Sequence, residues 1–374
     1  MKKCSQHNSG IGGQAVLEGV MMRNGEDYAI AVRRSDGSIT VRKEKYRGFF
    51  ADSPLKKIPF IRGIFVFIDS MVLGFKCTDY SATIYAEDDP DLSGEPADHK
   101  AGAGSQEKNP VPAGGAEAES PVSGREAEES ASVKAGADQD REKESVGERI
   151  LMTGVMVVSV FLALGLFMVL PYFLASALIR LTGLTALLSL FEGLIRIMIF
   201  VAYILAISMM KDIRRLFQYH GAEHKCINCL ENGQELTVEN AARATRLHKR
   251  CGSSFILFVM MVSIVLFFFI RVGNPVARVG LRILLLPVIS GISYELIRFA
   301  GSSDNPIIGL LSKPGLWLQG LTTREPDEEM LAVAIESVNA VFDWQTYLEK
   351  EFGLSRNGAA GDAEPSCTAA AGQA

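Results

Sequence analysis

Five residues of types that bind or work with metal ions lie within eleven positions, in the stretch YHGAEHKCINC from Tyr219 to Cys229. His220 and His224 are four positions apart, so on a helix their imidazoles share one face and reach the same ion. Glu223 directly precedes the second histidine. This H-x-x-E-H order is that of inverzincins, in which the two histidines hold zinc and the glutamate is the general base. The motif predicts a hydrolytic zinc site with Glu223 as its catalytic base.

Such a site needs a third ligand, and the sequence offers several. Glu295 follows His224 by 71 positions and corresponds to the distal glutamate of inverzincins. His248 and Cys251 are nearer, and a set of His220, His224, His248 and Cys251 is also open. His220 lies ten residues beyond Met210, which is about 15 Å along a straight helix. The segment must therefore fold back toward the membrane if Glu295 is to join the histidines.

A structural zinc site is an alternative. Cys226 and Cys229 form a C-x-x-C pair, and His248 and Cys251 form an H-x-x-C pair eighteen residues later, a spacing typical of closed four-ligand zinc. A turn at Asn232 and Gly233 and an N-cap at Thr237 would let the chain reverse between the pairs. The plain alternative is that these residues are interfacial histidines and small buried cysteines with no metal.

Four apolar segments place this motif beside a membrane. The ranges 150–179, 181–210, 252–270 and 279–297 each approach the roughly 20 residues that span a bilayer. The second contains only Glu192 and Arg196, which are four apart and can pair on one helix face. Eight basic residues lie between the second and third segments. The positive-inside rule therefore predicts a multi-pass membrane protein with both termini and the 211–253 hairpin in the cytosol.

The remaining chain divides into cytosolic parts. Residues 1–85 are expected to hold a β-hairpin turning at Ser35-Asp36-Gly37, another strand within 12–23, and an interfacial or partly buried helix over 58–76. Residues 86–149 have the composition of a disordered acidic linker. The 150–298 segment is the membrane domain. An amphipathic helix is expected within 299–352, on the sheet or the membrane, and 353–374 as a disordered tail.

Charge and cysteine content limit the partners. The linker holds seventeen acidic and seven basic residues, so the remaining chain carries a net charge of +5 although the whole chain carries −5. Membrane topology accounts for these basic residues, and we expect contact with anionic lipid but no nucleic-acid binding. Six cysteines in a reducing cytosol are thiols or metal ligands rather than a disulfide framework.

Several segments together resemble the YqhQ-like family of bacterial membrane proteins. They are IGGQAVLEGVMMR at 11–23, YHGAEHK at 219–225, LTVENA, LHKRCGSSF at 247–255, GISYELIR and KPGLWLQGLTTREPDE. That family is a domain of unknown function described as a predicted metal-dependent enzyme, so the resemblance implies a membrane location and a metal but no substrate. The matched positions are His220, Glu223, His224, His248, Arg250, Cys251 and Glu295. Cys226 and Cys229 are not among them, which favours a histidine site with Glu223.

The sequence thus predicts an α-helical polytopic membrane protein of about four spans with a small cytosolic β-containing N-terminal unit. The function we expect is that of a zinc-dependent hydrolase at the cytosolic membrane face, with His220 and His224 as ligands and Glu295 or His248 completing the set. The other hypothesis is a non-enzymatic membrane scaffold or assembly factor with a structural metal. Neither the substrate nor a protein partner follows from the residues.

Overall fold

The structure is a computed structural model that describes residues 7–48, 53–54, 58–88, 146–184, 187–270, 272, 274–302 and 306–354. The chain divides into two units, residues 1–95 with 167–374, and residues 96–166. The described part of the smaller unit contains the helix α3 (Val146–Leu164). Residues 89–145 of the linker predicted over 86–149 lie outside the described residues. The tail predicted over 353–374 lies outside them from residue 355 onward.

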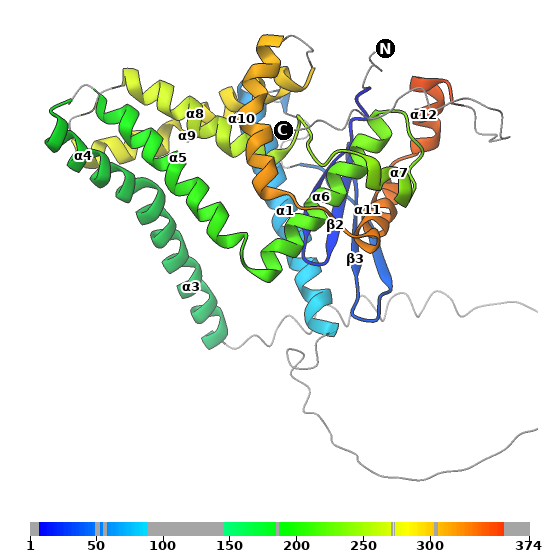
Figure 1. The fold of residues 1–374 in the computed structure, drawn as a ribbon. Coiled ribbons are helices and arrows are strands. Elements are labelled where there is room, and N and C mark those ends of the chain that lie inside the picture. The colour runs from blue at the N-terminus through cyan, green and yellow to red at the C-terminus, as the bar shows by residue number, and fades with distance from the viewer. Residues whose placement is uncertain are drawn as a thin grey trace, which may run out of the picture. The chain divides into compact units, whose positions relative to one another are not determined.

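The N-terminal unit is a four-stranded antiparallel sheet in the order β1-β2-β3-β4 (Figure 1). Its strands are β1 (Gly12–Val16), β2 (Gly19–Asn24), β3 (Asp27–Arg33) and β4 (Ile39–Lys45). The predicted hairpin at Ser35-Asp36-Gly37 is confirmed as the β3–β4 connection. The strand structure predicted within 12–23 is confirmed, but as two strands rather than one, because Glu18 has a φ of 49° and turns the chain back into β2.

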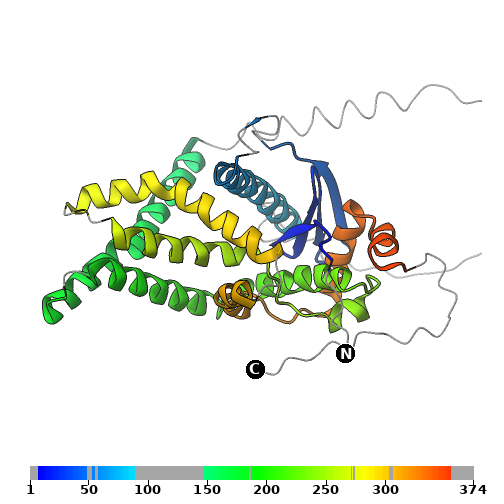
Figure 2. The same cartoon turned by 90° about the horizontal axis from the view of Figure 1, so that it is seen from above.

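Both faces of the sheet are covered by helices, because the central strands carry apolar residues on both sides. One face packs on α1 (Ile61–Asp88), and the other on α6 (Lys211–Glu231) and α11 (Glu328–Val341). Figure 2 shows the sheet between α1 and α11. The core facing α1 contains Val16, Met21, Tyr28, Ile30, Val32, Leu73, Cys77 and Ile84. The second core contains Val20, Met22, Ala29 and Ala31 together with residues of α6 and α11.

Four helices within the described residues are long and apolar enough to span a membrane, at Gly154–Thr182, Leu188–Ile207, Gly252–Phe269 and Gly280–Phe299. They match the four predicted segments, and the chain is a membrane protein. The elements are α3 with a π-helical turn and α4 (Leu170–Thr182), α5 (Leu188–Ile207), α8 (Gly252–Phe269) and α9 (Pro275–Ser302). The predicted pair of Glu192 and Arg196 is present at 2.9 Å, and Arg282 of α9 also binds Glu192.

The helix α1 joins the sheet to the membrane helices. The segment predicted as an interfacial or partly buried helix over 58–76 is the first half of α1, which packs on the sheet and crosses α9. At the crossing, a Cβ atom on Gly63 would lie 2.7 Å from the Cβ atom of Tyr294. Only glycine permits this approach, and small residues serve the same purpose between membrane helices generally.

Three further helices complete the large unit: α7 (Val238–Arg243), α10 (Pro306–Thr322) and α12 (Trp344–Phe352). The predicted amphipathic helix is α11, which begins after Asp327, whose carboxylate accepts a hydrogen bond from the Met330 amide at 2.8 Å. Its apolar residues Leu331, Ile335 and Val338 lie in the core that covers the sheet. Of the two surfaces predicted for this helix, the sheet is the one it contacts.

Candidate metal centre

The chain bends sharply between the membrane helix α5 and the helix that carries the H-x-x-E-H motif (Figure 1). Met210, the N-cap of α6, has extended backbone angles (φ −70°, ψ 138°), which separate α6 from α5. The turn at Gly233 and the short helix α7 then return the chain to Cys251, directly before the span of α8. Thr237 caps α7, as predicted, by accepting a hydrogen bond from the Asn240 amide at 3.2 Å.

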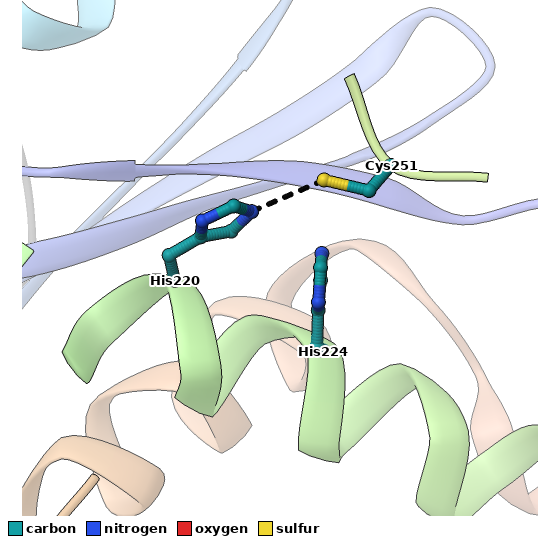
Figure 3. Close-up of side chains that lie close together, drawn as sticks. All are labelled: His220, His224 and Cys251. Carbon is teal, nitrogen blue, oxygen red and sulfur yellow. Dashed lines mark hydrogen bonds between the residues drawn. The ribbon is translucent and has the colours of Figure 1, made fainter. Parts of the chain in front are cut away.

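Three potential metal ligands meet where these segments come together. His220, His224 and Cys251 each offer one donor atom, and these atoms lie within 4.8 Å of one another (Figure 3). The two imidazole rings are stacked edge to face along α6 with centroids 4.5 Å apart. Two imidazole nitrogens and a thiolate are the donor types that zinc prefers. The set fits such an ion, and among the residues that the structure describes it comprises three protein ligands.

Backbone carbonyls orient both histidines. The Nδ1 atom of His220 lies 2.9 Å from the Thr322 carbonyl oxygen, and that of His224 lies 2.6 Å from the Arg246 carbonyl oxygen. A carbonyl oxygen only accepts, so each Nδ1 carries a hydrogen. Each Nε2 is therefore the atom directed at Cys251. Histidines that bind metals are typically held by this kind of hydrogen bond, which fixes the tautomer and the ring orientation.

The electrostatics of the cluster favour an anionic sulfur. Burial alone would lower the pKa of His220, but the adjacent Cys251 thiolate outweighs it and raises that pKa to about 9. Burial likewise opposes ionisation of Cys251, yet the imidazoliums of His220 and His224 hold its pKa well below the usual value. A low thiol pKa is what metal ligation requires, because the thiolate is the form that binds the ion.

Glu223 lies on α6 together with the two histidines, and it lines a cavity beside the cluster. Its side chain is 5% exposed, and burial raises its pKa against the opposing effect of His224 and His220. The strand β1 passes directly over it. A Cβ atom on Gly13 would lie 3.0 Å from the Glu223 Cγ atom and 2.5 Å from the Met21 carbonyl oxygen. The glycine therefore permits β1 to cover the motif.

A cavity of about 760 Å³ opens beside these groups. Its wall includes His220, Glu223, His224 and Cys251, and it continues along β1 and the residues that precede it. Pockets that bind small ligands have volumes of about 300–1,000 Å³. The donor atoms of the cluster are thus buried in the protein yet border a space large enough for a substrate. Other polar residues in the wall are Asn8, Gln14, Arg23, Ser70, His248, Arg250 and Ser253.

His248 lies near the cluster but is engaged elsewhere. Its ring centroid is 5.8 Å from that of His224, and its Nε2 atom donates to the Glu231 carboxylate at 3.3 Å. Arg250 also binds Glu231, and the His248 hydrogen bond together with the Arg250 charge, opposing the effect of burial, keeps the pKa of Glu231 below its usual value. The structure therefore does not place His248 among the three converging ligands.

The structure does not bring Glu295 to the cluster. Its carboxylate binds Arg62 of α1, with Oε1 2.6 Å from the arginine Nε, and accepts from the Phe60 amide at 3.3 Å. This ion pair lies where α1 crosses α9 and ties the two helices together. The partner of Glu295 is thus an arginine 233 positions away in the chain.

The closed four-ligand site is also not formed by the described residues. Cys226 and Cys229 lie in the apolar core between α6, α7, α11 and the sheet, both fully buried. The Cys229 thiol donates to the Glu235 carbonyl oxygen at 3.3 Å. Burial raises the pKa of Cys229 to about 12, as expected for a neutral thiol in a core. Only Cys251 of the proposed set of four reaches the metal cluster.

Some residues of the site had no signal of their own in the sequence. The C-terminal end of α10 supplies the Thr322 carbonyl and the side chain of Gln319, which accepts from the His248 amide at 2.9 Å and donates to the His248 carbonyl at 2.7 Å. Gly13 is the other. Both regions occur in the segments that resemble a known family, and that resemblance is the only sequence feature that could have pointed to them.

Comparison with known proteins agrees with that resemblance. Residues 58–344 match DUF1385, a family of proteins of unknown function. The chain is 34% identical over 348 residues to the uncharacterized protein YqhQ of Bacillus subtilis (strain 168), covering 92% of this chain and 96% of the relative. No solved structure matches. The chain therefore belongs to the DUF1385 family.

Proposed function

We propose that this protein is a zinc-dependent hydrolase that works at the membrane face. The observation that supports it is the convergence of three ligands, His220, His224 and Cys251, on the wall of a 760 Å³ cavity that Glu223 also lines. Structural zinc sites are closed by four protein ligands, whereas catalytic sites have three and keep one position open. The donor set thus favours a catalytic site over a structural one.

The residues have distinct roles in this proposal. A zinc ion held by three protein ligands supplies Lewis acidity, which polarises a carbonyl group and acidifies water. Glu223 accepts a proton from the attacking water at its carboxylate and delivers it to the leaving alcohol or amine. The water oxygen becomes part of the carboxylic acid product. The Thr322 and Arg246 carbonyls hold the two imidazoles in the tautomer that binds metal.

The proposed location is the cytosolic face of the bacterial inner membrane. Cys251 directly precedes the span of α8, so the cluster lies at the end of a membrane helix. The basic residues between the second and third spans favour a cytosolic position for this end and for both termini. Four passes of the membrane are consistent with that orientation.

Metal content tests the ligand set. Detergent-purified wild type should contain about one zinc per chain by mass spectrometry, and His224→Ala and Cys251→Ala should each lose it. Cys226→Ala is the matched control, since Cys226 is on the same helix but in the core. Loss of zinc in Cys226→Ala, with retention in Cys251→Ala, would contradict the proposed site.

Hydrolysis can be tested without knowing the substrate. Bacterial membrane extract is incubated with the zinc-loaded protein in water labelled with heavy oxygen, and the products are analysed by untargeted mass spectrometry. We expect carboxylic acids with one labelled oxygen for wild type and none for Glu223→Gln, which should retain its zinc. If wild type binds zinc at these three residues yet labels no product, a scaffold with a structural metal is the better description.

A further inference from the structure

A second cavity adjoins the metal-site cavity and is lined mostly by apolar residues. Its volume is about 650 Å³. The apolar residues in its wall are Val66, Phe67, Met71 and Phe75 of α1, Phe255 and Ile256 of α8, and Ile297 of α9. The rings of Phe67 and Phe255 are 5.3 Å apart and connect α1 to α8. We call this cavity the apolar groove.

The apolar groove is continuous with the candidate metal centre. Five residues line both cavities: Gln14, Ser70, Arg250, Cys251 and Gly252. The junction therefore includes the cysteine that offers its sulfur to the metal. A molecule that occupies both cavities passes Cys251 at the point where the lining changes from polar to apolar.

The apolar groove also lies at the ends of two helices that are long and apolar enough to span a membrane. Gly252 is the first residue of the α8 span, and Phe255 and Ile256 are within its first two turns, while Ile297 is near the end of the α9 span. Because α8 and α9 run in opposite directions, these two helix ends belong to the same membrane face. Side chains facing the groove remain exposed, with Phe75 at 69% and Met71 at 44%. Large exposed apolar surfaces of this kind mark sites that bind a membrane or an apolar ligand.

We propose that the substrate is a lipid with a long hydrocarbon chain, which lies in the apolar groove with its carbonyl group at Cys251. The proposal rests on the hydrolase function proposed above. The polar residues Asn8, Gln14, Arg23 and Ser253 of the first cavity then face the headgroup side. In the reaction, the water oxygen bonds to the carbonyl carbon, and the bond from that carbon to the alcohol or amine breaks. The proton passes through Glu223 to the leaving group, so the products are an acid and an alcohol or amine.

Two features of the apolar groove favour a lipid as its occupant. The groove is continuous with the metal-site cavity, and it lies at the ends of the α8 and α9 spans. An apolar groove that begins at Cys251 would contribute little to the binding of a water-soluble substrate. A lipid already present in the bilayer reaches the groove from the ends of α8 and α9 without leaving an apolar environment. Each methylene moved from water into an apolar site contributes about 0.8 kcal/mol, which corresponds to about fourfold in affinity.

Affinity labelling of Cys251 tests the groove separately from catalysis. Full-length protein in lipid nanodiscs is treated with a chelator and then with N-hexadecyl bromoacetamide or N-methyl bromoacetamide, which alkylate a thiolate with loss of bromide. Alkylation at Cys251 is measured by peptide mass spectrometry. The quantity compared between variants is the ratio of the long-chain rate to the short-chain rate, which cancels differences in thiolate reactivity.

Two variants narrow the groove and one is their control. Ser70→Trp fills the junction and Thr78→Trp fills the groove further along α1, and both positions are exposed. Val72→Trp adds the same side chain to an exposed position of α1 outside both cavities. We expect the rate ratio to fall about 15-fold in Ser70→Trp and Thr78→Trp, as when two methylenes lose their site, and to stay at the wild-type value in Val72→Trp.

The outcomes separate the two proposals. If the ratio of long-chain to short-chain alkylation rates is the same in wild type and both groove variants, the proposal of a lipid in the apolar groove is overturned. A changed ratio without any labelled product in heavy-oxygen water supports the groove and overturns the hydrolase. If wild type instead labels products that are peptides or water-soluble acids, the hydrolase stands and the lipid substrate does not.

Discussion

The Nε2 atom of His220 lies 3.2 Å from the sulfur of Cys251, although 31 positions separate the two residues in the chain. The contact joins α6, which packs on the sheet, to the first residue before a membrane helix. It also has an electrostatic consequence, because an imidazolium beside the sulfur stabilises the thiolate. Cys251 is therefore both the third ligand of the candidate metal centre and the most reactive thiol expected among the described cysteines.

Alkylation by iodoacetamide measures this thiolate. Because the neighbouring imidazoliums hold its pKa well below the usual value, Cys251 of chelator-treated protein should show an alkylation rate that rises less steeply with pH than that of an ordinary cysteine. An ordinary cysteine becomes about tenfold faster per pH unit below its pKa. Cys229, with a pKa of about 12, should stay unmodified. Bound zinc should protect Cys251 from alkylation. In His220→Ala, the alkylation rate of Cys251 should again rise steeply with pH. A steep rise in the wild type would contradict the ion pair.

Two adjacent glycines provide a matched test of Glu223. A Cβ atom on Gly13 would lie 2.5 Å from the Met21 carbonyl oxygen, 2.8 Å from the Met22 sulfur and 3.0 Å from the Glu223 Cγ atom, whereas one on Gly12 meets nothing within 4 Å. Gly13→Ala should displace Glu223 or β1 and lower the rate of heavy-oxygen incorporation by about 100-fold, the usual effect of a misplacement near 1 Å. Gly12→Ala should leave the rate unchanged. Zinc content should be normal in both, since no ligand moves. Equal rates in the two variants would show that β1 does not position Glu223.

The pair of Arg62 and Glu295 is predicted to stabilise the fold rather than bind metal. Glu295→Gln and Arg62→Gln should each lower the free energy of unfolding, because a hydrogen-bonded charge loses its partner. The double variant should be no less stable than either single variant, since both remove the same interaction. Thermal unfolding in detergent gives the stabilities, and zinc should remain at the wild-type level. Loss of zinc in Glu295→Gln would restore Glu295 as a ligand.

A buried charge cluster inside the membrane makes a further prediction. Glu192, 1% exposed, binds both Arg196 and Arg282, which are themselves mostly buried. Glu192→Gln should destabilise the protein by about 3 kcal/mol or more, because two buried cations lose their counterion. Glu349→Gln, on an exposed position of α12, should change stability by less than about 0.5 kcal/mol. A similar melting temperature for both variants would show that water or lipid headgroups compensate the arginines.

Patterns among residues that are close in the sequence were enough to predict the membrane spans, the β3–β4 hairpin and the helix that carries the motif. The four spans follow from the length of apolar runs, and the hairpin of β3 and β4 from a glycine turn between alternating strands. His220 and His224 share a face of α6 because a helix repeats every 3.6 residues. Each of these features depends on residues that are close in the sequence, where backbone geometry alone relates them. The break at Glu18 within 12–23 is the exception, since its positive φ occurs without a glycine.

The choice among the ligands depended on tertiary structure. Glu295, His248 and Cys251 were all compatible with the motif, and spacing could not rank them, because each is separated from it by a turn or by membrane helices. The bend after α5, the return through α7 and the contacts of α10 bring Cys251 to the histidines, while Arg62 and Glu231 engage the other two. The amino-acid sequence by itself determined the spans, the motif and its helix. The packing of distant segments decided the third ligand and the cavity beside it, because long-range contacts depend on the whole fold and not on local periodicity.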